Sequence, residues 1–277
     1  MKYRHAYHAG NFADVTKHVV LVALLARLAL KPRPLFFLET HAGRGRYDLT
    51  APAGGEARTG ILRLAAAPRA TLPALLVRYL DLACGPAELP RSYPGSPLLA
   101  AALLRPGDRA AFAELRQDEA AALARELRHD RRCSVHCRDG WEALGALLRP
   151  AEKRGLVLID PPYEEPAAEL ERVATALAQT ARRWPQGVLL AWYPIKLGVV
   201  TARFHRQLRA AQPGPLLVAE LCVHADDSRA GLNGSGAVIV NPPWQLDADL
   251  HAAWPALHAI LAPNGTGRSQ VAWLVGP

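Results

Sequence analysis

Cysteine, methionine and long hydrophobic runs are scarce in this sequence of 277 residues. The four cysteines are scattered, and Cys133 and Cys137 fall in one predicted strand, which is the wrong element for a zinc knuckle. We therefore expect free thiols in a reducing cytoplasm. The longest apolar run, residues 19–26, is too short to span a membrane, and no signal peptide is evident. These absences predict a cytoplasmic protein with no membrane partner and no bound metal.

Lysine is also rare, so arginine carries almost all of the net charge of +8. A basic protein suits a polyanionic partner, and nucleic acid is the commonest one. The sequence shows no zinc finger, recognisable helix-turn-helix or separate specificity domain of the kind that reads duplex DNA. The charge therefore favours a nucleic-acid partner, and the missing modules argue against DNA.

Segments typical of strands and helices alternate along the chain, which predicts an α/β fold with a doubly wound, mostly parallel sheet. We expect helix 15–30 to begin at Asp14 as its N-cap. Residues 48–109 interrupt the alternation and are predicted to be a small helical insertion within one domain, 1–277. Strands are expected at 35–39, 110–115, 133–137, 156–160, 188–192, 216–224, 237–240 and 270–275, with further helices at 119–129, 167–183, 202–211 and 248–261.

The most informative stretch is Leu156-Val-Leu-Ile-Asp160-Pro161-Pro162-Tyr163. Its apolar run predicts a buried strand that ends at a carboxylate, two prolines and an aromatic ring. Ligands of open α/β sheets bind at the carboxyl ends of the strands. The plain structural alternative is a strand that ends in a Pro-Pro turn with a surface aromatic residue.

An amino group on a nucleobase is a poor nucleophile, because its lone pair is delocalised into the ring. Asp160 and the carbonyl of Pro161 could accept its hydrogens, and proline brings no competing N–H. Tyr163 could stack on the base, a contact worth roughly 1–3 kcal/mol. Asp-Pro-Pro-Tyr is typical of S-adenosylmethionine-dependent amino methyltransferases, and this stretch looks like it.

A second stretch of the same kind, Val238-Ile-Val-Asn241-Pro-Pro-Trp244, lies near the C-terminus. Amino methyltransferases may use asparagine in the first position. The first stretch, however, follows a glycine-rich turn and an acidic strand end, where such a motif belongs. We therefore interpret the second stretch as structural.

Strand ends elsewhere predict a cofactor site. Gly43 and Gly45 follow the first strand, and glycines there let a cofactor approach the backbone closely. The third glycine of the dinucleotide fingerprint is absent, which fits S-adenosylmethionine better than NAD. Glu114 ends the second strand and could accept from ribose hydroxyls. Asp139 follows the third strand and could bind an adenine amino group, cap the next helix, or do both.

The N-terminus mixes aromatic rings and imidazoles, including Tyr3, His5 and His8, which suits stacking on bases. The alternative is an ordinary packed arm. His5-x-x-His8 lacks the further ligands that a metal would need. Lys17 and His18 lie in a helical first turn, which disfavours cations, and this weakly indicates a ligand.

In this order the pieces resemble one family across nearly the whole chain, the RlmJ-type 23S ribosomal RNA adenine-N6 methyltransferases. The stretches that carry the resemblance are Tyr3-Arg-His-x-x-His-Ala-Gly-Asn11, Ala13-Asp-Val-x-Lys-His18, Thr40-His-Ala-Gly-x-Gly-Arg-Tyr47, Tyr93-Pro-Gly-Ser-Pro97, Leu156-x-Leu-Ile-Asp-Pro-Pro-Tyr163 and Val240-Asn-Pro-Pro-Trp244. The N-terminal and Tyr-Pro-Gly-Ser-Pro stretches discriminate best, because DNA and protein methyltransferases share Asp-Pro-Pro-Tyr. Ala113 replaces the family's threonine before Glu114, and residues 51–60 match poorly.

The resemblance implies a Rossmann-like class I methyltransferase that modifies one adenine of 23S rRNA. It implies a substrate-facing tail, residues 1–13, with Tyr3 against the substrate and His5 and Lys17 near the reacting centre. Protein-free rRNA or an early precursor is the expected substrate, and a monomer is the default state. The implied cofactor contacts, with Gly43 added from the glycine argument, are His18, His41, Gly43, Ser96, Glu114, Asp139, Gly140 and Asp160.

We thus hypothesise that an unpaired or extruded adenine stacks on Tyr163, while Asp160 either accepts the proton or only orients the amino group. Three other functions compete with this hypothesis. The same chemistry could act on DNA adenine, the protein could bind rRNA without catalysis, or it could be a nucleotide-binding oxidoreductase. Intact Asp160 and the Gly43-x-Gly45 turn argue against the non-catalytic alternative.

Overall fold

A mostly parallel sheet forms the centre of the molecule in the computed structural model, which describes residues 5–50, 55–85, 89–148, 150–211, 213–226, 228–229, 231–262 and 265–277. The strand order in the described chain is β10-β8-β9-β7-β6-β1-β4-β5. The strands are β1 (Phe36–Glu39), β4 (Arg109–Glu114), β5 (Cys133–Cys137), β6 (Gly155–Ile159), β7 (Val188–Ile195), β8 (Leu216–Cys222), β9 (Gly234–Val240) and β10 (Arg268–Val275). Strands β9 and β10 run opposite to the other six strands of this sheet, so the predicted α/β fold with a mostly parallel sheet is confirmed.

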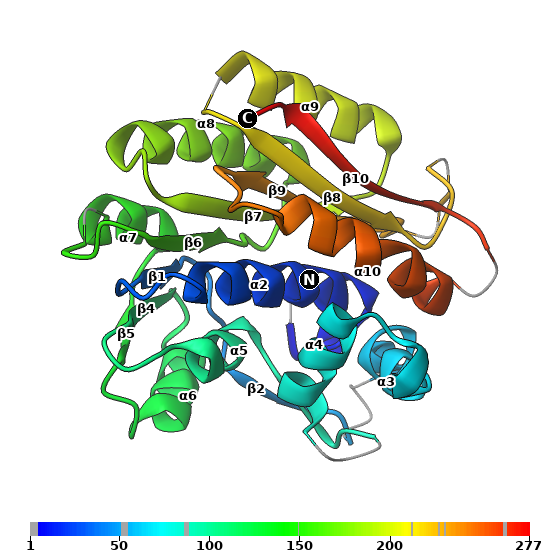
Figure 1. The fold of residues 1–277 in the computed structure, drawn as a ribbon, viewed down its shortest axis with the longest axis horizontal. Coiled ribbons are helices and arrows are strands. Elements are labelled where there is room, and N and C mark those ends of the chain that lie inside the picture. Colours follow the sequence, from blue (N-terminus) through cyan, green and yellow to red (C-terminus); the bar gives the residue numbers. More distant parts are fainter. Residues whose placement is uncertain are drawn as a thin grey trace.

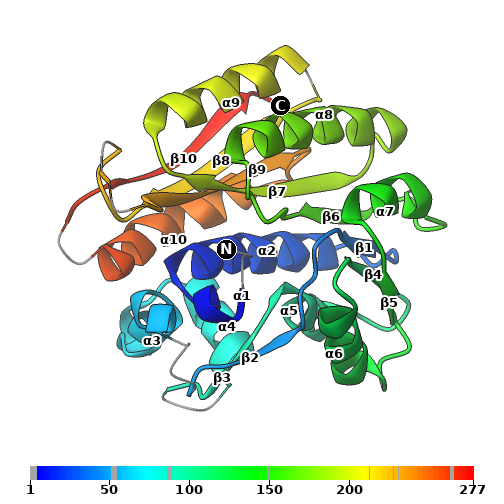
Figure 2. The same cartoon turned by 180° about the vertical axis from the view of Figure 1, so that it is seen from behind.

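Helices cover both faces of this sheet (Figures 1 and 2). One hydrophobic core joins one face of the sheet to α2 (Phe12–Ala29), α3 (Ile61–Ala65), α4 (Ala74–Cys84), α5 (Ser96–Leu103), α6 (Gln117–Leu127) and α10 (Leu246–Leu261). A second core joins the other face to α7 (Gly140–Leu147), α8 (Pro166–Arg183) and α9 (Gly198–Ala211). None of the helices in the described ranges is long and apolar enough to cross a membrane.

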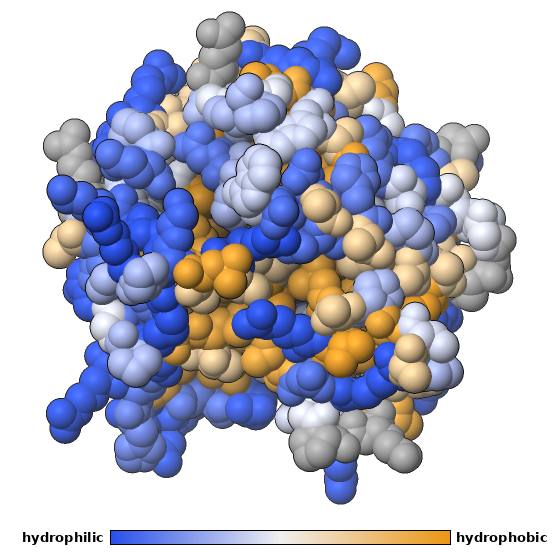
Figure 3. Space-filling view, viewed as in Figure 1, coloured by the Kyte–Doolittle hydropathy of each residue, from blue (hydrophilic) through white to orange (hydrophobic). Residues whose placement is uncertain are grey.

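Helix α2 is nearly all buried, because other elements surround it. It packs against β9, α4, α5 and α10, and hydrophobic residues gather over this part of the molecular face in Figure 3. The predicted N-cap, Asp14, is wrong. The helix begins earlier, at Phe12, and Asn11 caps it by accepting hydrogen bonds from Ala13 N and Asp14 N. Asp14 is instead a buried carboxylate in the first turn.

Other element boundaries also differ from prediction. Strands β7 and β9 pair as far as Ile195 and Gly234, whereas the predicted strands ended at residue 192 and began at residue 237. Pro194 and the glycines of β9 therefore lie in strands and not outside them. Beyond Ala191 no pairing with β6 is present, so the missing N–H of Pro194 costs no ladder bond on that side. Helix α9 begins at Gly198, four residues before the expected start.

The segment between β1 and β4 contains most of the elements that lie outside the alternating pattern. Strand β2 (Arg46–Asp48) pairs with β3 (Ser92–Pro94), so the segment returns to where it left the sheet. Between them lie the 3-10 turns η1 (Gly55–Thr59) and η2 (Arg69–Thr71) with α3 and α4. This pairing places the Tyr93–Pro97 stretch beside the glycine-rich turn that follows β1.

Candidate active site

The parallel strands β1, β4 and β6 end side by side and form the floor of the candidate site. Thr40, directly after β1, donates from its backbone N to the carbonyl of Leu158 over 3.0 Å. Ala42 N donates to Ala113 O over 2.9 Å. The turn after β1 therefore crosses the ends of both neighbouring strands, which is where the sequence predicted the site.

The glycine-rich turn meets the carboxylate that ends β4. Gly43 and Gly45 have φ of 64° and 86°, a backbone conformation that glycine adopts without strain. A Cβ at Gly43 would lie 2.5 Å from the hydroxyl of Tyr47. Glu114 accepts from Gly43 N and from Arg116 N, each over 2.8 Å. Each carboxylate oxygen can accept a further hydrogen bond, so Glu114 fixes the turn and still suits a ribose contact.

Asp139 caps helix α7, as one of its two predicted roles requires. Its Oδ1 accepts from Trp141 N over 2.7 Å and from Glu142 N over 3.1 Å. The adenine contact stays a prediction. The next residue, Gly140, touches the turn after β1, since a Cβ there would lie 2.0 Å from Thr40 O. The backbone at the start of α7 therefore contacts the backbone of the turn after β1, and a side chain at residue 140 would push the two segments apart.

A buried carboxyl group lies beneath the turn. Glu39 is fully buried, and Ser96 donates a hydrogen bond from its hydroxyl to Glu39 Oε1. The other oxygen, Oε2, is buried and has no hydrogen-bond partner among the described residues. Burial raises the pKa of Glu39 well above its usual range, outweighing Ser96 and the Lys17 charge, which both lower it. A polar group of a bound ligand could supply the partner that this oxygen lacks.

His41 lies beside this carboxyl group and is neutral at physiological pH. Burial lowers its pKa to about 4, against the charges of Asp160 and Asp139, which raise it. Its Nδ1 lies 2.7 Å from the Thr40 hydroxyl, and its ring meets Trp141 edge-on at 5.6 Å between centroids. A neutral imidazole in this position can accept or donate a hydrogen bond without adding charge.

Lys17 joins the second turn of α2 to the end of β6, because the helix begins at Phe12; the predicted placement of Lys17 and His18 in the first turn is wrong. Its ammonium lies 2.6 Å from Asp160 Oδ2 and 2.9 Å from Asp14 Oδ1. The side chains of Lys17 and Asp160 are 4% and 13% exposed. Burial lowers the pKa of Lys17, but the two carboxylates outweigh burial and raise it well above its usual value. The structure therefore brings the predicted residues Lys17 and Asp160 into direct contact, and it adds Asp14.

Contacts of Tyr163 hold the turn after Asp160 in place. No hydrogen bond from the described residues reaches the carbonyl of Pro161, so this acceptor is available. Tyr163 has a left-handed φ of 52°, and its hydroxyl donates to the backbone carbonyl of Trp192. The Tyr163 ring packs edge-on against Trp192 and is 6% exposed, and burial raises the pKa of its phenol. Its stacking on a base stays a prediction, while its buried contacts show that it holds the turn.

His18 connects the site to the Tyr93–Pro97 stretch. Its Nδ1 lies 2.6 Å from the hydroxyl of Tyr93, and the two rings stack at 5.5 Å. Tyr79 reaches the same hydroxyl over 2.8 Å. Because Ser96 follows Tyr93 at the start of α5, these contacts place the predicted cofactor residues His18 and Ser96 on neighbouring elements.

The structure describes only some of the N-terminal residues for which the sequence predicted a role. Tyr3 lies outside the described residues. His5 opens the short helix α1 (His5–His8), and its side chain is likewise not described. His8 is described, and its Nδ1 lies 2.9 Å from Glu56. In the described ranges, no group of three His, Cys, Asp or Glu side chains could hold a metal ion.

The second Pro-Pro stretch lies at the other end of the strands, where the parallel strands begin. Strand β9 runs against β7, so Asn241 follows Val240 next to the start of β7 and far along the sheet from Asp160. Asn241 donates to the carbonyls of Pro185 and Gly187 over 3.0 and 3.1 Å. It therefore ties two loops together, which agrees with the structural interpretation.

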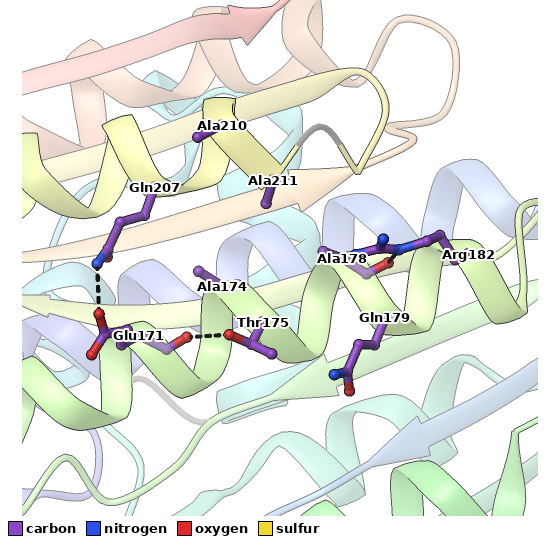
Figure 4. A pocket seen from close by; sticks show the side chains of 9 residues that line it. All are labelled: Glu171, Ala174, Thr175, Ala178, Gln179, Arg182, Gln207, Ala210 and Ala211. Carbon is purple, nitrogen blue, oxygen red and sulfur yellow. Dashed lines mark hydrogen bonds between the residues drawn. The ribbon is translucent and has the colours of Figure 1, made fainter.

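A shallow groove between α8 and α9 contains none of the predicted site residues (Figure 4). Alanines and ordinary polar side chains line it, and Gln207 bridges it by donating to Glu171 over 3.3 Å. Its groups do not converge on one point, so it adds nothing to the candidate site.

Three residues that contact the site were not predicted from the sequence: Asp14, Glu39 and Trp192. Asp14 lies three residues before Lys17, a spacing that places both side chains on one face of a helix and could have revealed the pair. Glu39 ends a buried strand beside a glycine-rich turn, which was an equally usable signal. Trp192 carries no such local signal, because only the pairing of β6 with β7 brings it to Tyr163.

Comparisons with known proteins agree across the length of the chain. A family model described as "Ribosomal RNA large subunit methyltransferase D, RlmJ" matches residues 32–275. Proteins named "Ribosomal RNA large subunit methyltransferase J" from Haemophilus influenzae and Escherichia coli are 40% and 38% identical, with 99% of each chain covered. The crystal structure of protein LPL1258 from Legionella pneumophila has a TM-score of 0.87 at 33% identity, and the match covers 96% of this chain and 98% of that one.

Proposed function

The chain belongs to the RlmJ family of large-subunit ribosomal RNA methyltransferases, and we propose that it transfers a methyl group from S-adenosylmethionine to N6 of one adenine in 23S rRNA. Its fold is the Rossmann-like fold of class I methyltransferases. One observation carries the proposal: Lys17 holds the Asp160 carboxylate at the carboxyl end of β6, beside the available carbonyl of Pro161.

The residues around the turn after β1 fit S-adenosylmethionine. The cofactor supplies an electrophilic methyl group when it is bound. Gly43 and Gly140 let the turn after β1 pack closely against Tyr47 and α7, and Glu39 Oε2, which has no partner among the described residues, could bind a polar group of the cofactor. Glu114 would bind the ribose and Asp139 the adenine amino group, while the remaining contacts would come from His18, His41, Ser96 and Asp160.

Asp160 and Pro161 would make the amino nitrogen nucleophilic. Lys17 binds Asp160 Oδ2, so the other carboxylate oxygen would accept one amino hydrogen and the Pro161 carbonyl the second. With both hydrogens bound, the nitrogen lone pair turns out of the ring system toward the methyl group. Catalysis is then mostly positioning, with Asp160 as the nearest proton acceptor.

The remaining predicted roles concern the substrate. Tyr3 and Tyr163 would contact the target base, and His5 would lie close to the reacting centre with Lys17. The 6% exposure of Tyr163 limits it to an edge contact in this arrangement. The adenine would be unpaired already, or extruded at a cost of about a few kcal/mol.

We propose a matching organisation for the chain as a whole. It is a single methyltransferase domain, 1–277, with a helical insertion at 48–109 and a substrate-facing tail at 1–13. It would act as a monomer in the cytoplasm on protein-free 23S rRNA or an early precursor. Its net charge of +8 supports binding to a polyanion of this kind.

The first experiment measures transfer of a labelled methyl group from S-adenosylmethionine to protein-free 23S rRNA, with duplex DNA in parallel. Digestion to nucleosides should show the label in N6-methyladenosine from the RNA alone. Asp160→Asn should lower the rate at least 100-fold and leave RNA binding intact. Label in DNA, or full activity of Asp160→Asn, would contradict the proposal.

A further inference from the structure

The insertion contacts the N-terminal segment through one carboxylate. Glu56, in η1, accepts a hydrogen bond from Asn11 Nδ2 over 2.9 Å, and His8 Nδ1 lies 2.9 Å from the same oxygen. The side chains of His8 and Glu56 are each 34% exposed. One carboxylate therefore holds two residues of the predicted tail.

Backbone contacts seat the same segment on the insertion. Ile61 N donates to Gly10 O over 2.8 Å. A Cβ at Gly60 would lie 2.2 Å from Gly10 O, so the two backbones are in direct contact. Gly10 itself turns the chain with φ of 75°. Because residues 8–11 fit closely against 56–61, a change in η1 should move the start of α2.

A chain of hydrogen bonds leads from this contact to the catalytic carboxylate. Gly10 N donates to Asp14 Oδ2 over 3.0 Å, and Asp14 Oδ1 lies 2.9 Å from the Lys17 ammonium. Lys17 then binds Asp160 over 2.6 Å. Gly10, which contacts the insertion, is thus connected to Asp160 through three successive polar contacts.

We propose that Glu56 is a positioning residue that fixes the N-terminal segment for substrate engagement and, through Gly10 and Asp14, the Lys17–Asp160 pair. The inference rests on the proposed function, because it assumes that residues 1–13 face the RNA. In this role Glu56 would touch neither base nor cofactor.

Charge supports the same conclusion. The hydrogen bond and charge of Glu56 raise the pKa of His8, against burial. Burial would raise the pKa of Glu56, but the bonds from His8 and Asn11 outweigh burial and lower it. Glu56 also fixes the amide of Asn11, whose Oδ1 must face Ala13 N and Asp14 N to cap α2.

The test compares steady-state kinetics of Glu56→Ala, Glu56→Gln and wild type. Glu56→Ala should raise KM for rRNA at least fivefold, with KM for S-adenosylmethionine and the melting temperature nearly unchanged. Glu56→Gln keeps an oxygen for the Asn11 amide and should restore part of the loss. The matched control is Asp81→Asn, which breaks the Arg69–Asp81 pair elsewhere on the insertion and should change neither KM.

Hydrogen exchange of residues 8–14 gives a readout that needs no activity. Exchange should accelerate in Glu56→Ala but not in Asp81→Asn. Equal exchange, or an unchanged KM for rRNA, would overturn the proposal, as would parallel losses of both KM values and melting temperature without rescue by glutamine. If wild type methylates no RNA, the proposed function fails, and the exchange comparison still decides whether Glu56 fixes the segment.

Discussion

Lys17 is a buried ammonium between two carboxylates, so its removal should affect stability as well as catalysis. Lys17→Met leaves Asp14 and Asp160 facing each other without a counter-charge. We expect the free energy of unfolding to fall by about 3 kcal/mol, as is typical when one partner of a buried pair is lost. Denaturant titration measures the change. Adding Asp14→Asn should recover part of it, and an unchanged midpoint in Lys17→Met would show that the pair contributes little.

Glu39 should make stability depend on pH in the opposite sense from most carboxylates. Because its pKa is raised, the folded protein binds more protons at Glu39 than the unfolded chain does, and stability is lost as pH rises above about 4.5. Glu39→Gln has no such proton to lose. Its unfolding free energy relative to wild type should therefore increase between pH 5 and pH 8, by at most about 1.4 kcal/mol per pH unit. A difference that does not vary with pH would contradict the burial argument.

At the scale of elements, the contact between α7 and the turn after β1 offers a matched pair of glycines. Gly140→Ala would place a methyl group 2.0 Å from Thr40 O, so helix and turn must separate. We expect at least tenfold weaker cofactor binding, measured by calorimetry, and a lower melting temperature. Gly145→Ala, in the same helix with nothing within 4 Å, should leave binding intact and raise stability by up to about 1 kcal/mol.

Local patterns in the sequence were enough to predict strand ends and turns. Asp160, Gly43, Glu114 and Asp139 all lie at or just after the carboxyl end of a strand, and the parallel sheet brings these ends together. Contacts between distant segments were not predictable in the same way. Lys17 and Asp160 are 143 positions apart, and no periodicity encodes that one reaches the other.

The errors in element boundaries have a related cause. Asp14 was taken for the N-cap because its residue type favours that position, whereas Asn11, which is equally suitable, caps the helix. Pro194 and the glycines of β9 are poor strand formers when taken alone. Pairing between β7 and β9 overrides that preference, and such pairing is a property of the assembled sheet.

For the whole molecule, the net charge of +8 predicts that substrate binding depends on salt. Neutralised phosphates release counterions, so KM for rRNA should rise steeply between 50 and 200 mM salt. Binding of S-adenosylmethionine, which is not a polyanion, should change much less. Parallel titrations of both substrates check this. Equal salt dependence would show that screening acts on the protein itself and not on the RNA interface.

The burial of α2 also has a consequence for synthesis on the ribosome. Ser235, which donates to the carbonyl of Ala13 at the start of the helix, is translated 222 residues after it. Until β9 and α10 emerge, an apolar helix of 18 residues lacks two of the elements that cover it. Nascent chains of intermediate length should therefore bind chaperones strongly, and release should coincide with translation of β9. The active site, which requires the start of α2 in place, would form only after β9 has emerged.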